Sequence, residues 1–445
     1  MVALIKAAQL LLSLSILVVL HELGHYWAAR AFKTRVEKFY LFMNPGFSLF
    51  KKQIGETEWG IGWLPLGGYV KIAGMIDESM DTEQLQSEPQ PWEFRSKPAW
   101  QRLIIMLGGI IVNLILGFAI YSMVLLAWGE TVLPADRIPY GLEVDDRLEV
   151  LGFQDGDQIV TINGEFPETF TQIRRSLFFS QVHDVALNRN GVEVALHFEE
   201  DLGQMLVDSS IRSPFGLRVP CMVHEITVGS GAENGGLQAG DRFVSIDGEP
   251  RRFHGEVTSY LQAHPNQRVD LEVQRMDGSL AALQCETDSA GELGFSQVSP
   301  FEMGEFALED RKFGLGSALT SGFSLASTTL REYVLSMRFL FSKAGASQVG
   351  SLVTFGSIFD AGWDWEIFWR NTAFFSLILA FMNLLPIPAL DGGHVVFLLY
   401  EMVARRPAPE KFLERAQVVG IVFLLMLMVY ALGNDFWRLI TGQFG

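Results

Sequence analysis

Two histidines and a glutamate lie within one helical turn near the start of the chain. His21, Glu22 and His25 form the pattern His-Glu-x-x-His. On an α-helix, residues four positions apart lie on the same face, so the two imidazoles can bind one metal ion while Glu22 lies beside it. A catalytic zinc ion has three protein ligands and keeps a further position for water. The pattern therefore predicts a zinc site that needs one more ligand from elsewhere in the chain.

The surroundings of this pattern are those of a membrane helix. The preceding residues, from Leu10 to Leu20, are all apolar or serine. Ionisable side chains inside or at the rim of such a helix are energetically expensive and usually functional. A chance occurrence of the pattern on a helix is the alternative. Against it, neither His21 nor His25 has an obvious structural task among apolar neighbours.

Asp391 is the candidate for the third ligand. It follows an apolar segment that runs from about Phe368 to Leu385, and Pro386 and Pro388 lie in between. Prolines free helix carbonyls, and such backbone occurs at membrane depth where it is buried in protein or lines a polar cavity. A carboxylate beside this broken helix is a natural metal ligand, although an Asp-Gly-Gly turn taken alone is more often a loop.

Four apolar segments are expected to span the membrane and to position these residues. A hydrocarbon core requires about 20 residues, and the candidate spans are Val2 to about Ala29, Leu103 to Trp128, about Phe368 to Leu385, and Ala416 to about Leu432. Basic residues directly follow the first span, so its C-terminal end is expected on the cytoplasmic side and the N-terminus outside. This first span lacks a small-residue cleavage site and is expected to be a retained anchor.

The segment from Phe313 to Phe341 decides on which side Asp391 lies. It is apolar enough to suggest another span, but it carries Arg331, Glu332 and Arg338. If it crossed the membrane, Asp391 would end on the side opposite to the histidines. We therefore expect an amphipathic helix on the outer membrane surface, which leaves both halves of the metal site on one side.

Small residues form one face of the second span. They are Gly108, Gly109, Asn113 and Gly117. Small residues allow helices in a membrane to approach closely, and polar side chains hydrogen-bond between them. The face predicts close helix packing, with Asn113 able to hydrogen-bond across the contact.

The composition is that of a membrane protein with large soluble parts. The 445 residues leave room for two or three domains, 49% are hydrophobic, and the net charge of −17 argues against a nucleic-acid partner. Much of the acidity lies between Glu130 and Asp310. Cys221 and Cys285 define neither a disulfide framework nor a zinc site, and a single disulfide between them is left open.

Short strands are expected between the first two spans. From Phe39 to Met75, apolar residues alternate with polar ones and are interrupted by glycines, among them Gly67 and Gly68. An exposed strand edge beside the metal site could hold an extended peptide by main-chain hydrogen bonds. A sheet that only covers the membrane face is the alternative. The polar stretch from Asp77 to Pro91 is expected to be a loop.

The soluble region contains an internal repeat. The nine residues from Gly156 to Gly164 match those from Gly240 to Gly248, 84 residues later, and each copy predicts a strand closed by an Asn-Gly or Asp-Gly turn. The pattern resembles the core strand of PDZ domains, which bind extended peptides by strand addition. The second copy also has the preceding turn, from Val228 to Gly240. Two small β-rich domains that only pack or filter by size are the alternative.

Taken together, these motifs resemble the site-2 protease family of intramembrane zinc metalloproteases, of the M50 type. The resemblance rests on the histidine motif, the PDZ-like copies, the stretch from Gly67 to Lys71, and the stretch from Asn383 to Gly392. It covers nearly the whole chain. It implies that His21, His25 and Asp391 bind one zinc ion per chain and that Glu22 activates water.

The same resemblance implies a substrate site and a class of substrate. Asn383 matches the asparagine that contacts substrate in this family, and Gly67, Gly68, Tyr69 and Val70 match part of its membrane-associated β-element. The implied substrates are single-span membrane proteins such as anti-sigma factors and remnant signal peptides, cleaved in regulated intramembrane proteolysis. The other expected partners are membrane lipids, and no nucleic acid is expected.

The expected architecture is a mixed membrane protein. Four transmembrane helices form the metalloprotease core, accompanied by a small membrane-associated β-sheet and two tandem PDZ-like domains of α+β or β-rich type. The expected location is the bacterial inner membrane, with both termini and the PDZ-like domains periplasmic and the active site toward the cytoplasm. The boundaries are: 1–30, first transmembrane helix; 31–99, cytoplasmic-side loop with the β-element; 100–129, second transmembrane helix; 130–213 and 214–300, the PDZ-like domains; 301–363, linker with the surface helix; 364–393, third transmembrane helix with the Asp391 motif; 394–445, cytoplasmic loop and fourth transmembrane helix.

Two other classes of protein are weighed against an enzyme. A non-catalytic membrane adaptor would bind extracytoplasmic peptide tails through the PDZ-like domains, but a structural zinc site has no use for a base such as Glu22. A metal transporter would need paired polar groups through several spans, and one such cluster is visible.

Overall fold

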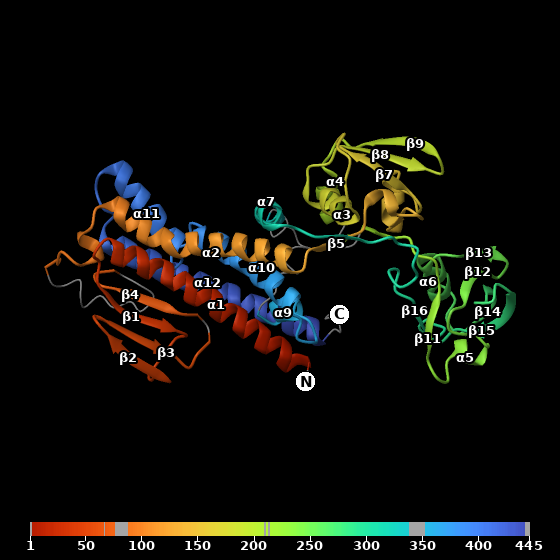
Figure 1. The fold of residues 1–445 in the computed structure, drawn as a ribbon, viewed down its shortest axis with the longest axis horizontal. Coiled ribbons are helices and arrows are strands. Elements are labelled where there is room, and N and C mark those ends of the chain that lie inside the picture. The colour runs from red at the N-terminus through yellow and green to blue at the C-terminus, as the bar shows by residue number, and fades with distance from the viewer. Residues whose placement is uncertain are drawn as a thin grey trace. The chain divides into compact units, whose positions relative to one another are not determined.

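The computed structural model describes residues 2–65, 67–75, 88–208, 211, 214–337 and 352–440. The chain forms two compact units, drawn in Figure 1. The helical unit consists of Met1–Gly129 together with Lys312–Gly445, and the β-rich unit is Glu130–Arg311.

Four helices of the helical unit are long and apolar enough to cross a membrane. They are α1 (Val2–Ala31), α2 (Ala99–Ala127), α10 (Trp365–Leu384) and α12 (Glu410–Ile440). No other helix of the described residues meets these requirements of length and composition. Four candidate transmembrane helices combined with β-sheets agree with the mixed membrane protein expected from the sequence.

Helix α2 lies at the centre of the helical unit. It contacts α1, α10, α7 (Leu315–Ser336) and α11 (Asp391–Ala404). A Cβ atom added to Gly108 would lie 2.5 Å from the carbonyl oxygen of Gly24 on α1, and one added to Gly117 would lie 2.6 Å from Leu377 on α10. The small-residue face of α2 therefore lets two neighbouring helices approach its backbone.

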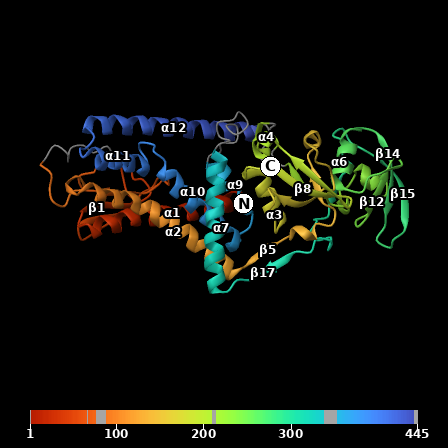
Figure 2. The ribbon, with the colours of Figure 1, turned by 90° about the horizontal axis from the view of Figure 1, so that it is seen from above.

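Helix α7 crosses the direction of α2 instead of running along it, as Figure 2 shows. Gly322 of α7 meets Ser122 of α2, and the rings of Phe323 and Phe118 lie 5.0 Å apart. It is not among the candidate spans, as expected for the segment that begins at Phe313. Residues 338–351 and 76–87 lie outside the described residues, so the end of the expected surface helix and most of the expected loop from Asp77 are not described.

A four-stranded sheet follows α1 and packs beside it. The strands are β1 (Val36–Leu41), β2 (Phe50–Ile54), β3 (Thr57–Ile61) and β4 (Tyr69–Ile72), in the order β2-β3-β1-β4. The neighbours β1 and β3 are parallel, and the other pairs are antiparallel. Strand β4 is at the end of this sheet and contacts α1, so it runs beside the helix that carries the histidines.

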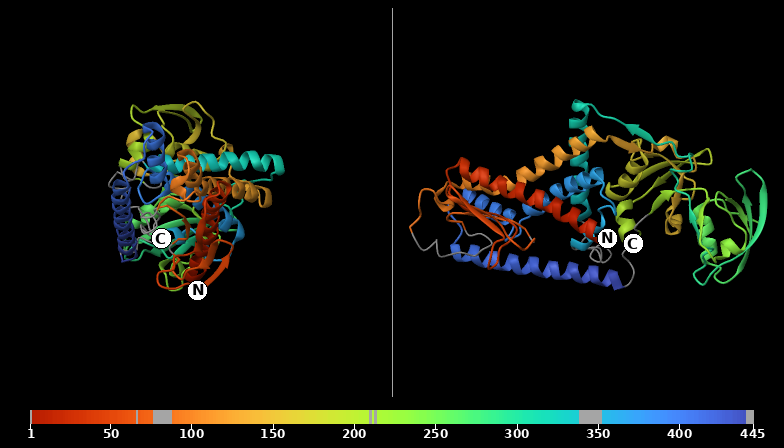
Figure 3. Two further views of the ribbon diagram at one scale, coloured as in Figure 1. Left: turned by 90° about the vertical axis from the view of Figure 1, so that its left-hand side faces the viewer. Right: turned by 60° about the horizontal axis from the view of Figure 1, so that its bottom comes forward.

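The chain breaks between α10 and α11. Helix α10 ends at Leu384, Ala389 has a φ of 79°, and Asp391 is the first residue of α11. The backbone N–H of Ala389 donates to Gln417 of α12, a helix that otherwise lies apart from α1 and α2 (Figure 3). This break agrees with the two prolines in the sequence.

Residues 394–404 are helical, which corrects the loop expected after Asp391. The apolar residues Val395 and Leu398 are three positions apart and lie on one side of α11. They are buried in a core with Ile105 and Met106 of α2 and Ile72 of β4. Burial of this apolar side stabilises the helix, and the same core fixes α1, α2, α11 and the sheet around the metal site.

The β-rich unit has two halves, each with a helix packed on a small antiparallel sheet. The repeated sequence pattern forms the strands β7 and β12, and the turns that follow them place Asn163 and Asp247 at positive φ. Elements of the first half are β6 (Leu142–Val144), β7 (Gln158–Ile162), α3 (Phe170–Phe179), β8 (Asp184–Arg189), β9 (Val192–His197), α4 (Leu202–Asp208) and β10 (Phe215–Leu217). Elements of the second half are β11 (Val223–Ile226), α5 (Gly231–Asn234), β12 (Arg242–Ile246), β13 (Glu249–Pro250), α6 (His254–Gln262), β14 (Arg268–Gln274), β15 (Leu280–Glu286) and β16 (Phe295–Gln297).

The end of the first half and the two cysteines of the second half can be compared with the sequence predictions. Strand β10 pairs with β6, so the first half extends to Leu217, past the expected boundary at residue 213. Cys221 and Cys285 are free and buried in the core of the second half, so the disulfide left open by the sequence is not formed.

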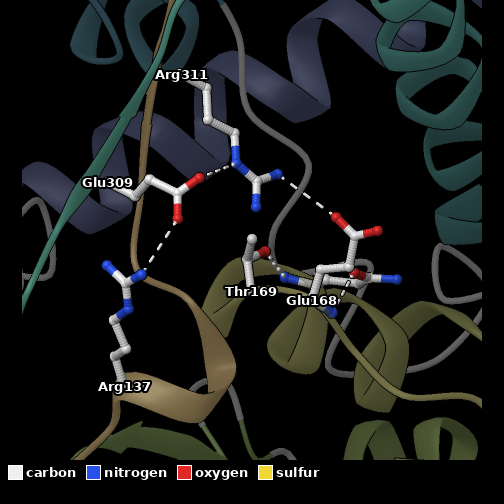
Figure 4. A network of polar contacts seen from close by, with 6 residues as sticks. Arg137, Glu168, Thr169, Glu309 and Arg311 are labelled. Atoms are coloured by element: carbon white, nitrogen blue, oxygen red, sulfur yellow. Dashed lines mark hydrogen bonds and ion pairs between the residues drawn. The ribbon is translucent and has the colours of Figure 1, made fainter.

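The β-rich unit begins and ends in one two-stranded ribbon. Strand β5 (Glu130–Val132) pairs antiparallel with β17 (Glu309–Arg311). Figure 4 shows the ion pairs at this ribbon, where Arg311 lies 3.0 Å from Glu309 and 3.5 Å from Glu168, and Arg137 lies 3.7 Å from Glu309. The pairs with Arg137 and Glu168 connect β17 to the segments that follow β5 and precede α3, and the hydroxyl of Thr131 donates to Asp310 between the two strands.

Candidate metal centre

Three of the predicted site residues converge at one point. The Nε2 atoms of His21 and His25 lie 3.2 Å apart, and Oδ2 of Asp391 lies 3.2 Å from the first and 3.3 Å from the second. The histidines are one turn apart on α1, and the aspartate begins α11. The break after α10 thus brings a carboxylate from near the end of the chain to a motif near its start.

The spacing of these atoms fits a tetrahedral zinc ion. Ligands that bind zinc at about 2.0–2.1 Å in tetrahedral geometry lie about 3.3 Å from one another. The three observed separations match this value. The Asp391 Oδ2 atom is buried and accepts no hydrogen bond of normal geometry from the described residues, which is costly for a carboxylate unless a cation binds it. The donor set of two imidazoles and one carboxylate is also that of catalytic zinc sites.

Glu22 lies beside this cluster and is not one of the three converging groups. Its carboxylate is hydrogen-bonded by the backbone of Val70 in β4. A Cβ atom on Gly68 would lie 3.5 Å from Glu22 Cγ and 2.7 Å from Val18. The terminal strand of the sheet therefore runs directly past the glutamate, and its glycine allows this close approach.

The residues predicted to bind substrate are Asn383 and the stretch from Gly67 to Val70, and they come from two different elements. Asn383, in the last turn of α10, has its side-chain nitrogen 3.3 Å from Nε2 of His21. The ring of Tyr69 stacks on Tyr40 at 5.3 Å, and its hydroxyl donates to Asn44, so this side chain is held within the sheet. Gly67 has a φ of 140° at the turn before β4. Asn383 is thus adjacent to the ligand atoms, whereas the Gly67–Val70 stretch approaches through its backbone.

Helix α2 provides contacts behind the histidines that the sequence did not predict. The Nδ1 atom of His25 lies 2.8 Å from the main-chain oxygen of Ile105, and Nδ1 of His21 lies 3.2 Å from the Asn113 amide. A main-chain carbonyl carries no signal of residue type, so Ile105 could not have been found. Asn113 was recognisable as a polar residue in an apolar helix, but its partner was not.

The geometry defines a class of protein, and comparison with known proteins defines the family. Two buried histidines and a half-buried aspartate, with a glutamate beside them, have the ligand set of a zinc-dependent peptidase. Residues 9–427 match the model of peptidase family M50. The chain belongs to peptidase family M50, as the resemblance of its motifs implied. It is a metalloprotease, and zinc is its cofactor.

Curated relatives match the chain along nearly its whole length. A putative zinc metalloprotease of Vibrio cholerae is 27% identical over 457 residues, which cover 96% of this chain and 98% of the relative. The regulator of sigma-E protease RseP of Escherichia coli is 26% identical over 456 residues, covering 97% and 98%. The protein of the same name from Salmonella typhimurium is 27% identical over 466 residues, again covering 97% and 98%.

Proposed function

We propose that this metalloprotease acts as a site-2 protease that cleaves peptide bonds within the transmembrane segment of single-span substrates. The observation that carries the proposal is the tetrahedral spacing of His21, His25 and Asp391 beside Glu22, on helices long and apolar enough to span a membrane. His21, His25 and Asp391 would hold the zinc ion. When bound, zinc acts as a Lewis acid on the scissile carbonyl and on water.

Glu22 is the proposed general base and then general acid. It is the carboxylate beside the three ligands, so it is placed to take a proton from the attacking water and return it to the leaving amine. Its hydrogen bond to the backbone of Val70 fixes the carboxylate and links it to the strand on which substrate would lie.

Substrate binding is assigned to the backbone edge of β4 and to Asn383. The carbonyls of a substrate helix are hydrogen-bonded within that helix and must be freed before attack. An unwound segment can add by main-chain hydrogen bonds to a strand at the end of a sheet, as β4 is. Gly67, Gly68, Tyr69 and Val70 would provide this edge, and the Asn383 amide, 3.3 Å from Nε2 of His21, would contact the extended segment near the scissile bond.

The finer biological assignment follows the relatives and the positive-inside rule. The proposed location is the bacterial inner membrane, with the termini and the β-rich unit periplasmic and the metal site toward the cytoplasm, which the positive-inside rule supports. The two halves of that unit act as PDZ-like domains that admit substrates whose outer part has been trimmed. Anti-sigma factors are the proposed natural substrates, since relatives are named regulators of sigma-E protease, together with remnant signal peptides.

The test is cleavage of a tagged single-span reporter by the purified protein in detergent. Wild type is expected to cut within the membrane segment, and Glu22→Gln is expected to retain zinc but not to cut. Glu56→Gln is the matched control, because Glu56 is an exposed glutamate paired with Arg30. Full activity of Glu22→Gln would exclude it as the base. A wild type that binds no zinc would exclude the assigned metal site.

A further inference from the structure

Three residues of α2 form one face behind the metal site. Ile105, Gly109 and Asn113 are spaced by four positions, so they lie one above another on the same side of the helix. All three contact or approach the histidines: the Ile105 carbonyl meets His25, Asn113 meets His21, and a Cβ atom on Gly109 would lie 2.5 Å from Nε2 of His25. At this face the main chain of Ile105, the position of Gly109 and the side chain of Asn113 all lie against the imidazole rings, while the Ile105 side chain packs in the apolar core.

The geometry of the ligands determines the tautomer of both rings. The atoms that converge with Asp391 are Nε2 of His21 and Nε2 of His25. A neutral imidazole that binds a metal through Nε2 carries its proton on Nδ1, and that N–H needs an acceptor. At His25 the acceptor is the main-chain oxygen of Ile105, 2.8 Å away.

At His21 the group beside Nδ1 is the side-chain amide of Asn113, at 3.2 Å. The nitrogen and oxygen of an amide exchange places by a half-turn of the side chain, and only the oxygen can accept the Nδ1 proton. The Oδ1 atom of Asn113 is buried and, within the part of the chain that the structure describes, has no hydrogen-bond donor. A half-turn of the amide would place this oxygen beside Nδ1 of His21. The oxygen would lose no hydrogen bond by this movement and would gain one.

We propose that Asn113 is a positioning residue that accepts a hydrogen bond from Nδ1 of His21 and holds this ring in its metal-binding tautomer and orientation. This inference rests on the proposed metal site. Asn113 is fully buried, and the hydroxyl of Ser376 on α10 donates to its main-chain oxygen at 2.7 Å. The backbone that carries the amide is thus held by two helices.

A structural role in helix packing makes a different prediction. If Asn113 served only to pack the helices, an apolar replacement would change the stability of the protein and leave zinc affinity unchanged. An orienting acceptor predicts lower zinc affinity in that variant and recovery by any side chain that keeps an acceptor. Loss of such an outer hydrogen bond lowers metal affinity by about 10- to 100-fold.

The experiment measures zinc affinity by chelator competition on the full chain in detergent. Asn113→Leu removes the acceptor while keeping a branched side chain of four heavy atoms, and is expected to bind zinc about 10- to 100-fold more weakly. Asn113→Asp keeps an acceptor and is expected to retain wild-type affinity. Ser122→Ala is the matched control, because Ser122 is on the same helix and its hydroxyl donates to Phe118. The visible spectrum of the cobalt(II)-substituted protein is expected to change in Asn113→Leu alone.

The outcomes separate this inference from the metal site on which it rests. If wild type binds no zinc, or His21→Ala binds it as tightly as wild type, the metal site itself is wrong. If the site binds zinc but Asn113→Leu matches wild type in affinity and spectrum, the positioning role is refuted. Equal weakening in the Leu and Asp variants would also refute it. If zinc-free Asn113→Leu unfolds at a lower temperature than zinc-free wild type, Asn113→Ala is used in its place.

Discussion

Gly109 is the residue whose substitution tests the metal site most directly. It faces both imidazole rings, and a Cβ atom added there would lie 2.5 Å from Nε2 of His25 and 2.6 Å from Cε1 of His21. Non-bonded heavy atoms prefer separations of about 3.5–4.0 Å. Gly109→Ala therefore requires the rings and the helix to separate by about 1 Å.

Helix α2 has little freedom to make this movement. The preceding residue, Gly108, lies against the backbone of Gly24 on α1, so the rings of His21 and His25 must move instead. A displacement of about 1 Å in catalytic groups can reduce the rate by about 100-fold. This corresponds to about 2.7 kcal/mol of transition-state stabilisation. We expect Gly109→Ala to lose about this much in kcat/KM and to bind zinc more weakly.

Reporter cleavage and zinc content are measured on Gly109→Ala and on Gly117→Ala. Gly117 is on the same helix, but its added Cβ would meet the flexible side chain of Leu377 on α10. Gly117→Ala is expected to unfold at a lower temperature than wild type. The folded fraction of this variant is expected to bind zinc and to cleave the reporter as wild type does. If Gly109→Ala keeps wild-type zinc affinity and kcat/KM, the histidines are not fixed against α2 as described.

Three further outcomes follow from the contacts described above. Val70→Pro removes the backbone N–H that faces Glu22, so it is expected to lower kcat while zinc is retained. Val70→Ala is the control, because it keeps that N–H. An equal loss of kcat in both variants would exclude the main-chain role. Burial, with Asp155 adding repulsion, raises the pKa of Glu143 above its ordinary value of 4.5. The protonated form is therefore favoured by folding, and its contribution to stability is present below pH 4.5 and lost as the pH rises through the folded pKa. Glu143→Gln should thus stabilise the β-rich unit at neutral pH, with a gain that shrinks toward pH 4 in thermal unfolding, and a gain independent of pH would contradict this. Asp157→Ala leaves Arg189 without its 2.8 Å ion pair and should destabilise the first half by about 3 kcal/mol in denaturant unfolding; an unchanged midpoint would show that the pair contributes nothing.

The sequence predicted those parts of the fold that depend on the order of residues within one segment. Long apolar runs predicted the spanning helices, and the spacing of His21 and His25 predicted that their rings face one point. Asp391 was chosen as a carboxylate beside a broken helix, the count of membrane crossings agreed with that choice, and the structure brings it to that point. Each of these inferences needs only a pattern within one segment, together with the sidedness of the membrane.

The parts that were missed depend on contacts between segments. The helix that begins at Asp391 has ordinary apolar spacing, but it was hidden by the prolines before it and the basic residues after it. The parallel pairing of β1 with β3 requires knowledge of which strands are neighbours, and no single strand contains it. The acceptor for His25 is a main-chain oxygen of α2, which any residue at position 105 would supply.

The ribbon of β5 and β17 has a consequence for how the protein is assembled. Glu130 and Arg311 are directly opposite in that ribbon, and opposite residues of antiparallel strands have Cα atoms only about 4.5–5.5 Å apart. The whole β-rich unit is therefore an insertion whose two ends lie close enough to be joined by a hairpin turn. A short turn in place of residues 130–311 would therefore join α2 to the segment before α7 without stretching the chain.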